Sequence, residues 1–346
     1  MKSRSLALAI VLTLHAASSM AADDGAPLEE LIVSARRILI SGAGGEALDS
    51  AAIARKRART SDTASLLKGI AGVSLYEAGG VSRLPAIHGL ADDRLRTQVD
   101  GVDVAAACPN HMNSPLSYID PSAVAGVDVY PGVSPVSVGG DSIGGSIVVR
   151  SQDPEFAGRG ARLVKGEAGT FYRSNGSGWG GHLAADLATE HLSVGYTGAY
   201  AQSDNYQAGD DFKTYTFTGR AGHALPKDEV GSTAFRSANQ ALRVAWQAGP
   251  HLLDFTYSLQ DIPEEGYANQ RMDLTDNRND RFNLAYTGRL GWGTVQARAY
   301  YQHTRHEMDF GDDKRYWYGA ASGGNNPPGG DAAPCAPIGP NCAAGM

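Results

Sequence analysis

Cysteine, basic charge and long hydrophobic runs are all scarce in this sequence. Its 346 residues include three cysteines and 30 basic against 37 acidic residues, which gives a formal net charge of −7. Because non-specific affinity for nucleic acid comes from basic charge, we expect no nucleic-acid partner. No stretch after residue 22 approaches the roughly 20 apolar residues that a membrane-spanning helix needs, so the sequence excludes a helical membrane protein.

Motifs of common enzymes are also missing. The sequence has no arrangement of nucleophile and base, and the glycine turns at Gly139-Gly140 and Gly144-Gly145 lack the Lys-Ser/Thr that completes a phosphate-binding loop. We therefore predict that the protein is not an enzyme.

The first 22 residues have the three regions of a secretory signal peptide in the right order. Lys2 and Arg4 precede an apolar run from Leu6 to Leu14, and small residues follow. This order predicts export, with cleavage after Ala21 or Ala22, and the alternative is a buried N-terminal helix.

Export permits disulfide bonds, which gives the three cysteines different expected roles. Cys335 and Cys342 bracket a short loop with two prolines, and a bridge could close this loop if their Cα atoms lie close enough. Cys108 then remains unpaired, and an odd cysteine in an oxidising compartment requires either burial or a use.

Residues 23–155 are predicted to form a small α+β domain. A helical stretch at 61–69 is combined with short β-like runs and glycine-rich turns. The β-like runs are 72–76, 96–99, 126–130 and 146–150.

Residues 158–346 are dominated by alternation of apolar and polar side chains. For example, Leu242, Val244 and Trp246 alternate with Arg243 and Ala245, so that each segment has one apolar and one polar face. The predicted strands are 160–171, 181–189, 191–202, 239–248, 251–260, 281–290 and 294–310.

The predicted connections alternate between tight and long. The joints at 190, 249–250 and 291–293 are tight, whereas 203–238 and 261–280 are long, with the segment around Tyr215 and Phe217 as a hairpin arm inside the first of these. Short periplasmic turns and long outer loops are typical of an outer-membrane β-barrel, and a soluble β-sandwich is the alternative. Because seven strands cannot close a bacterial antiparallel barrel, we predict an incomplete transmembrane barrel.

Ordered motifs in the first half resemble those of TonB-dependent outer-membrane receptors. Residues 28–35 resemble a TonB box, and four further segments resemble the signatures of the plug domain. These segments are 63–73, 87–102 with Arg94, 127–132 and 142–147. His88 departs from the pattern, because the family usually has arginine there.

The resemblance implies a plugged barrel of about 22 strands in the Gram-negative outer membrane, of which this chain supplies the plug and about a third of the strands. Such a receptor binds a scarce solute and releases it when TonB pulls on the plug. The expected partners are therefore outer-membrane lipid and TonB, contacted through Leu31 to Ala35 by strand addition. The alternative for residues 28–35 is a plain linker. We expect the receptor to be a monomer.

Two segments carry side chains that suit a soft metal ion. Cys108 and Met112 lie four residues apart, with His111 between them, and His306 and Met308 share the predicted inward face of the last strand, near its outer end. A buried core is the alternative for the first pair, and an ordinary lining of the barrel mouth is the alternative for the second.

Thiolate and thioether donors select Cu(I), whereas zinc gains little from thioethers. The predicted metal ligands are thus Cys108, Met112, His306 and Met308, with His111 in an assisting role and copper, as Cu(I), the transported ion. The same residues resemble the Cys-x-x-x-Met and His-x-Met of the NosA/OprC copper-receptor branch of the family. A siderophore or cobalamin receptor and a secreted binding or adhesion fragment are the other functions that this sequence leaves open.

Overall fold

A computed structural model describes most of the chain between residues 45 and 344. The described residues are 45–77, 79–139, 142–214, 216, 218, 222–314, 316–318 and 342–344. The predicted signal peptide and TonB box, the predicted hairpin arm at Tyr215 and Phe217, and Cys335 of the predicted disulfide lie outside them. Those expectations therefore stay predictions.

The first part of the described chain is the α+β domain, which we call the plug domain. It contains one α-helix, four 3₁₀ helices and seven short strands. In chain order they are β1 (Glu46–Leu48), α1 (Ser50–Arg57), η1 (Thr63–Leu67), β2 (Val73–Tyr76), β3 (Leu84–Ile87), η2 (Asp92–Arg94), β4 (Leu95–Val99), β5 (Val102–Asp103), η3 (Pro115–Tyr118), η4 (Pro121–Ala123), β6 (Val124–Pro131) and β7 (Gly145–Ser151).

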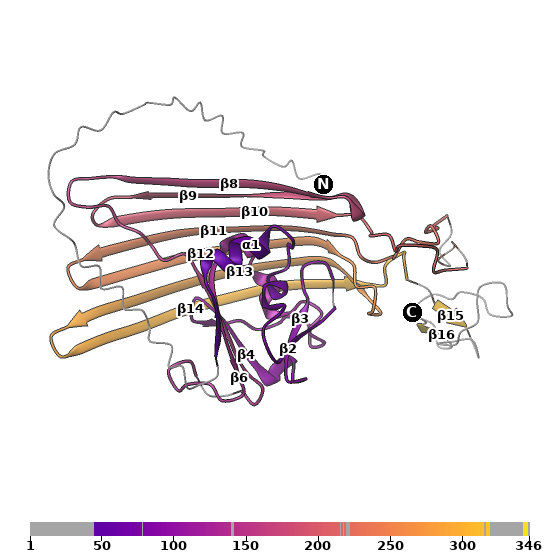
Figure 1. Ribbon diagram of the computed structural model, residues 1–346, viewed down its shortest axis with the longest axis horizontal. Coiled ribbons are helices and arrows are strands. Elements are labelled where there is room, and N and C mark those ends of the chain that lie inside the picture. Colours follow the sequence, from indigo (N-terminus) through magenta and orange to yellow (C-terminus); the bar gives the residue numbers. More distant parts are fainter. Residues whose placement is uncertain are drawn as a thin grey trace, which may run out of the picture. The chain divides into compact units, whose positions relative to one another are not determined.

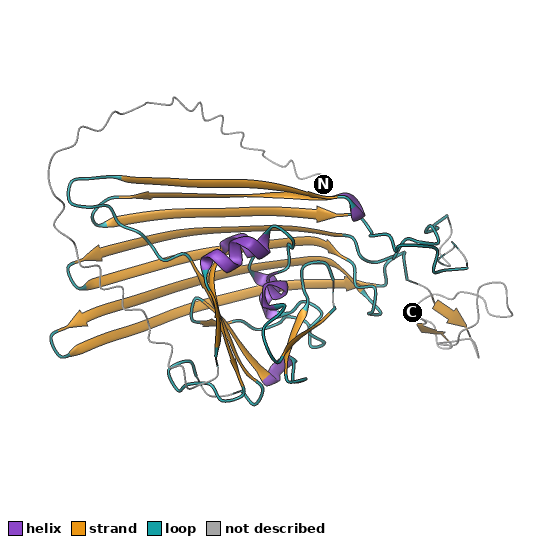
Figure 2. Cartoon of the chain, viewed as in Figure 1, coloured by secondary structure: helices purple, strands orange, loops and turns teal. Residues whose placement is uncertain are grey.

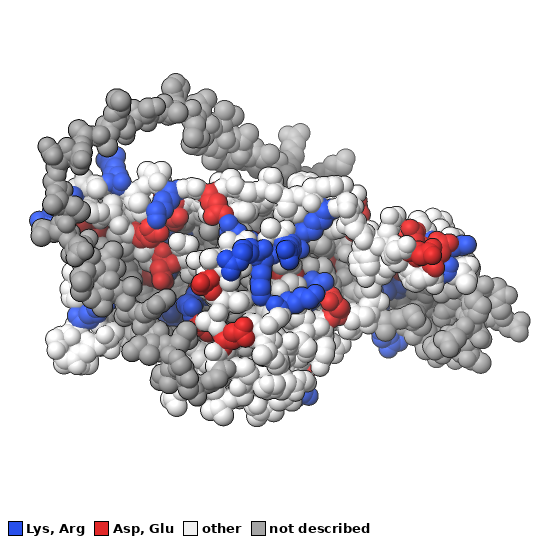
Figure 3. Space-filling view, in the orientation of Figure 1, with Lys and Arg blue, Asp and Glu red and all other residues white. Residues whose placement is uncertain are grey.

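Helix α1 is fixed by its ends rather than by an apolar stripe. The Asp49 side chain accepts a hydrogen bond from the Ala52 N–H at 2.8 Å and caps the N-terminus. Arg55, Lys56 and Arg57 fill the last turn, where positive charge is favoured by the helix dipole, and Figure 3 shows basic side chains gathered over this region. Only Ile53 of the helix is buried, so the apolar periodicity of this segment is too weak to predict a helix from the sequence.

The plug core is a five-stranded sheet with the helices packed against it. Its strand order is β1-β6-β7-β4-β5, and β4 and β7 are parallel while the other neighbours are antiparallel. Strands β2 and β3 form a separate hairpin-like pair. The core residues at or below 1% exposure are Ile53, Ala64, Leu66, Leu67, Ile87, Val99, Leu116, Val127, Val129, Ile147 and Val149.

The second part is an open antiparallel sheet of seven long strands, which we call the wall. Each strand pairs with the next one along the chain, from β8 to β14 (Figure 1). The strands are β8 (Leu163–Arg173), β9 (Gly178–Ala188), β10 (Leu192–Ser203), β11 (Phe235–Ala248), β12 (His251–Glu265), β13 (Asp273–Leu290) and β14 (Gly293–Asp309). The short 3₁₀ turn η5 (Asn175–Ser177) joins β8 to β9 (Figure 2).

Large apolar side chains are exposed along the wall. They belong to the alternating positions that the sequence pattern assigned to the apolar face. Among them are Leu192, Tyr196, Tyr200, Leu242, Trp246, Leu253, Phe282, Leu284 and Tyr301. The opposite face is polar and contacts the plug domain.

None of the described helices is both long and apolar enough to cross a membrane.

Near the end of the chain, β15 (Tyr316–Tyr318) and β16 (Cys342–Ala344) form a short antiparallel pair.

The predicted fold class is confirmed, since an α+β plug domain precedes seven antiparallel strands that do not close into a barrel. Several predicted boundaries are wrong. Strand β11 begins at Phe235, β12 continues to Glu265 and β13 begins at Asp273, so the connection predicted at 261–280 is only residues 266–272. The predicted helix at 61–69 is the shorter 3₁₀ helix η1. Asp62 starts it by accepting a hydrogen bond from the Ser65 N–H at 2.9 Å.

Candidate functional site

Cys108 and Met112 lie in the loop between β5 and η3 and are both buried. Cys108 is 6% exposed and Met112 is 4% exposed. The loop turns back on itself, because the His111 N–H donates to the Cys108 carbonyl at 2.9 Å and His111 has a left-handed φ of 50°. The Ala107 N–H donates to the Tyr118 hydroxyl at 3.3 Å, which attaches the loop to η3.

The structure brings the two sulfur atoms of this loop into an apolar cluster that the plug and the wall build together. Val81, Cys108 and Met112 come from the plug. The wall and its loops supply Ala201, Phe235, Ile262, Tyr267 and Leu274. Met308 of β14 is partly buried and packs against the same cluster, so three of the four predicted donor residues belong to this cluster or border it.

His306, the fourth predicted donor, lies two residues before Met308 on the same face of β14. Its Nδ1 is 3.2 Å from the Asn277 Oδ1 on the neighbouring strand β13. Its Nε2 is inaccessible to solvent and has no hydrogen-bond partner. Buried polar atoms are almost always hydrogen-bonded, and this nitrogen is one of the few in the described part of the chain that are not.

His111 also has one buried ring nitrogen without a partner, Nδ1, whereas its Nε2 lies 3.4 Å from an Asp93 carboxylate oxygen. Within the described ranges, no group of three or more His, Cys, Asp or Glu side chains could hold a metal ion. The candidate set therefore depends on the thioethers of Met112 and Met308.

A buried glutamate of the wall attaches the plug beside this cluster. Glu265 is fully buried, and its Oε1 accepts from the Val81 N–H at 2.9 Å and from the Ser82 hydroxyl at 2.8 Å. Its Oε2 accepts from the Tyr267 hydroxyl at 3.1 Å. Sequence analysis missed Glu265 because residues 261–280 were predicted to be a loop.

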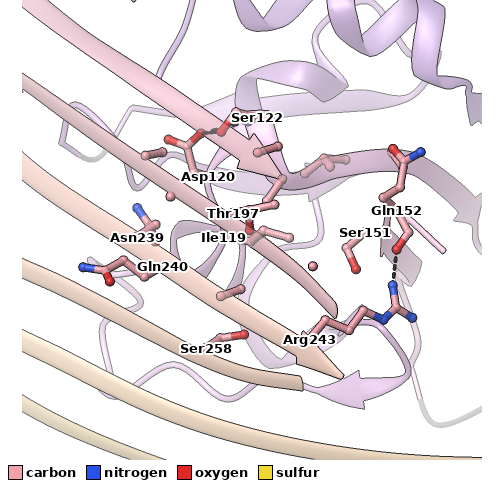
Figure 4. Close-up of a pocket in the computed structure, with 18 of the residues that line it drawn as sticks. Ile119, Asp120, Ser122, Ser151, Gln152, Thr197, Asn239, Gln240, Arg243 and Ser258 are labelled. Carbon is pink, nitrogen blue, oxygen red and sulfur yellow. Dashed lines mark hydrogen bonds between the residues drawn. The ribbon is translucent and has the colours of Figure 1, made fainter. Parts of the chain in front are cut away.

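A cavity of about 440 Å³, lined by polar and apolar side chains, lies between the plug and the inner face of the wall (Figure 4). Residues around Asp120 and Ser122 line it from the plug, and side chains of β10 to β12, such as Thr197 and Ser258, line it from the wall. Arg243 of β11 crosses the gap and donates to the Gln152 carbonyl of the plug. The cavity thus leaves open space along the boundary between the two parts.

Burial changes the acid–base behaviour of two plug residues at this boundary. Loss of hydration raises the pKa of the Tyr118 hydroxyl to about 12, so this hydroxyl stays protonated at neutral pH. Burial also raises the pKa of Asp120, against the opposing hydrogen bonds from Ser122.

The chemistry of the buried donors is soft and nearly neutral. One thiol, two thioethers and one imidazole nitrogen without a partner suit a soft, singly charged metal ion better than a hard cation that needs carboxylate oxygens. Desolvation by the surrounding apolar side chains strengthens that preference, because an unpaired charge in such surroundings is costly.

One family model matches the first part of the described chain. Residues 46–146 match the family model of the TonB-dependent Receptor Plug Domain. No curated protein matches the chain significantly.

The fold as a whole is similar to several solved outer-membrane receptors. The structure titled "Copper transporter OprC" is 24% identical with a TM-score of 0.63, and the match covers 77% of this chain and 38% of that one. A variant of the ferric enterobactin receptor PfeA from Pseudomonas aeruginosa is 17% identical with a TM-score of 0.56, over 76% of this chain and 41% of that one. The FrpB iron transporter from Neisseria meningitidis is 16% identical with a TM-score of 0.56, over 77% and 42%. The chain therefore spans about two fifths of the length of these structures, and its fold is that of their plug domain with part of their barrel.

Proposed function

We propose that this chain is the plug and part of the barrel of a TonB-dependent outer-membrane receptor that imports copper. The plug-domain match and the shared fold support the receptor, and the buried cluster with Cys108, Met112 and Met308 supports the copper. The single observation that carries the metal assignment is the Nε2 of His306, which is buried without a partner beside that cluster.

In this proposal the plug and the wall each supply half of the copper site. Cys108 and Met112 are the plug ligands, and His306 and Met308 are the wall ligands. A thiolate, two thioethers and an imidazole together prefer Cu(I), and the thiolate balances the single positive charge of the ion. Copper is the transported substrate, so no catalytic step is involved.

The release of copper follows from the division of the copper ligands between the plug and the wall. A pull by TonB on the N-terminal segment near Leu31 to Ala35 would move Cys108 and Met112 relative to His306 and Met308. Separating the ligands in this way lowers the affinity for copper, and the cavity beside Asp120 then offers space for an exit path. The exposed apolar face of the wall, with Trp246 and Leu253, faces outer-membrane lipid in this account.

A metal-content measurement tests the proposal. The full-length protein is purified in detergent, loaded with Cu(I) under reducing conditions, desalted and analysed for copper by mass spectrometry. We expect about one copper per chain in the wild type and a loss of copper in Cys108→Ala and in Met112→Ala. Met272→Ala is the matched control, because Met272 is a partly buried methionine outside the cluster. Unchanged copper content in both plug variants would falsify the site.

A siderophore receptor is the second candidate, because the ferric enterobactin receptor and FrpB share this fold. Growth conditions separate the two functions. A copper receptor is induced by copper limitation and its deletion slows growth there, whereas a siderophore receptor gives both effects under iron limitation.

A secreted binding or adhesion fragment belongs to a different class of function. Such a fragment would be recovered in the soluble fraction. The receptor would be recovered from outer membranes and would migrate differently on gels before and after heating.

A further inference from the structure

Asn277 of β13 connects the two halves of the proposed copper site through a chain of side-chain amides. It is fully buried, and its Oδ1 faces the Nδ1 of His306 at 3.2 Å. Its Nδ2 donates to the Gln260 Oε1 at 3.1 Å. Gln260, which is 2% exposed, donates in turn from its Nε2 to the Ser117 carbonyl of the plug and to the Asn239 Oδ1, the latter at 3.2 Å.

The Ser117 carbonyl fixes the direction of every hydrogen bond in this chain. A backbone carbonyl only accepts, so the Gln260 amide nitrogen must face it and the Gln260 oxygen must face Asn277. The Asn277 nitrogen then donates to that oxygen, and the Asn277 oxygen is left facing His306. Because an amide oxygen only accepts, the His306 Nδ1 must carry the proton.

The consequence is a defined tautomer of His306. With the proton on Nδ1, the lone pair is on Nε2, which is the nitrogen that is buried without a hydrogen-bond partner. Histidine ligands of metal ions usually donate their other ring N–H to a fixed acceptor, which sets the tautomer and the ring orientation. Here the acceptor for the His306 N–H is the amide oxygen of Asn277, so this residue adds no negative charge to the copper site.

We propose that Asn277 is a positioning residue for the copper ligand His306, and that Gln260 makes its orientation depend on the position of the plug. This inference rests on the proposed copper function. When the plug moves and Ser117 withdraws, Gln260 keeps only the Asn239 acceptor of the wall, and Asn277 is held less firmly with its oxygen toward His306. Plug displacement thus weakens the wall ligand as well as removing the plug ligands.

The test is Cu(I) affinity of the full-length protein, measured by competition with a chromogenic Cu(I) chelator. Loss of a positioning partner typically lowers metal affinity by about 10–100-fold, so we expect a loss of that size in Asn277→Leu and in Gln260→Leu. Asn277→Asp keeps an oxygen acceptor for the His306 N–H and should restore most of the affinity lost in Asn277→Leu. The Asn277→Asp side chain can accept from His306 but cannot donate to Gln260. If Asn277 only stabilised the fold through its bond to Gln260, Asn277→Asp would not restore the affinity.

Asn279→Leu is the matched control. Asn279 is on the same strand and face and is 2% exposed. It lies opposite Gln260 in the register of β12 and β13, but its amide nitrogen donates to the Thr304 hydroxyl at 2.7 Å. Its variant loses a buried amide but should bind Cu(I) like the wild type.

The outcomes separate this inference from the proposed function. Wild-type affinity in Asn277→Leu, equal losses in Asn277→Leu and Asn279→Leu, or no rescue by Asn277→Asp would overturn the role of Asn277, even if Cys108→Ala abolishes binding. Wild-type affinity in Gln260→Leu would overturn the dependence on the plug. A wild-type protein that binds no Cu(I) would overturn both the inference and the copper function.

Discussion

Replacing Glu265 by alanine should loosen the attachment of the plug to the wall beside the candidate site. The carboxylate accepts hydrogen bonds from the Val81 N–H and the Ser82 hydroxyl, and the surroundings exclude water. Glu265→Ala leaves both donors buried without a partner. Each such group costs about 1–3 kcal/mol, so the segment around Val81 should lose at least about 2 kcal/mol of stability against local opening.

Hydrogen exchange measured by mass spectrometry reads out this loss directly. Because about 1.4 kcal/mol corresponds to a tenfold change in an equilibrium, the amides of residues 79–83 should exchange at least roughly 30-fold faster in Glu265→Ala than in the wild type. Exchange in the plug sheet, for example in β6 and β7, should remain unchanged, because that sheet has its own core.

Glu264→Ala is the control for this experiment. Glu264 is the adjacent residue, but its exposed side chain is paired at 3.7 Å with the exposed side chain of Arg236, a contact worth little. Equal exchange of residues 79–83 in Glu265→Ala and in the wild type would refute the attachment, as would the same acceleration in Glu264→Ala.

Two further predictions concern the plug backbone and a loop carboxylate. A Cβ on Gly145, at φ +127°, would lie 2.2 Å from the Tyr130 carbonyl, whereas one on Gly132, at φ +80°, would meet nothing within 4 Å. Gly145→Ala should therefore lower the denaturation midpoint of the full-length protein clearly more than Gly132→Ala, and equal shifts would contradict the close approach. For Asp313, burial raises the pKa, but hydrogen bonds from Ser232, Asn205 and His223 outweigh it and lower the pKa below 3.8. Asp313 thus stabilises the fold above about pH 4, and this contribution is lost as the pH falls through its folded pKa. The difference in melting temperature between wild type and Asp313→Asn should shrink as the pH falls below about 4; a difference that grows over that acidic range would show the opposite linkage.

The sequence predicts the wall well where its two faces differ. Alternation of Leu242, Val244 and Trp246 with polar neighbours locates β11, and tight turns such as 249–250 are in place. At the ends on the long-loop side the strands continue with polar residues on both faces. The alternation of apolar and polar side chains disappears there. The first eight residues of β13, from Asp273 to Asp280, therefore fall in a segment whose sequence predicts a loop.

Because these strand ends are polar on both faces, the sequence does not single out the residues that support the candidate site. Asn277 and Glu265 lie in these polar extensions, and their importance comes from partners far away in sequence, such as Val81 for Glu265. Cys108 and His306 could be selected from the sequence because thiol and imidazole are rare and chemically distinctive. An asparagine in a polar run carries no comparable signal.

The donor set of bound copper tests the central claim most directly. X-ray absorption at the copper edge, recorded on the full-length protein loaded with Cu(I), should show a first shell dominated by sulfur with one nitrogen donor. In His306→Leu the nitrogen should disappear while sulfur remains. A shell of nitrogen and oxygen alone, or an identical spectrum for wild type and His306→Leu, would contradict a site built from Cys108, Met112, His306 and Met308.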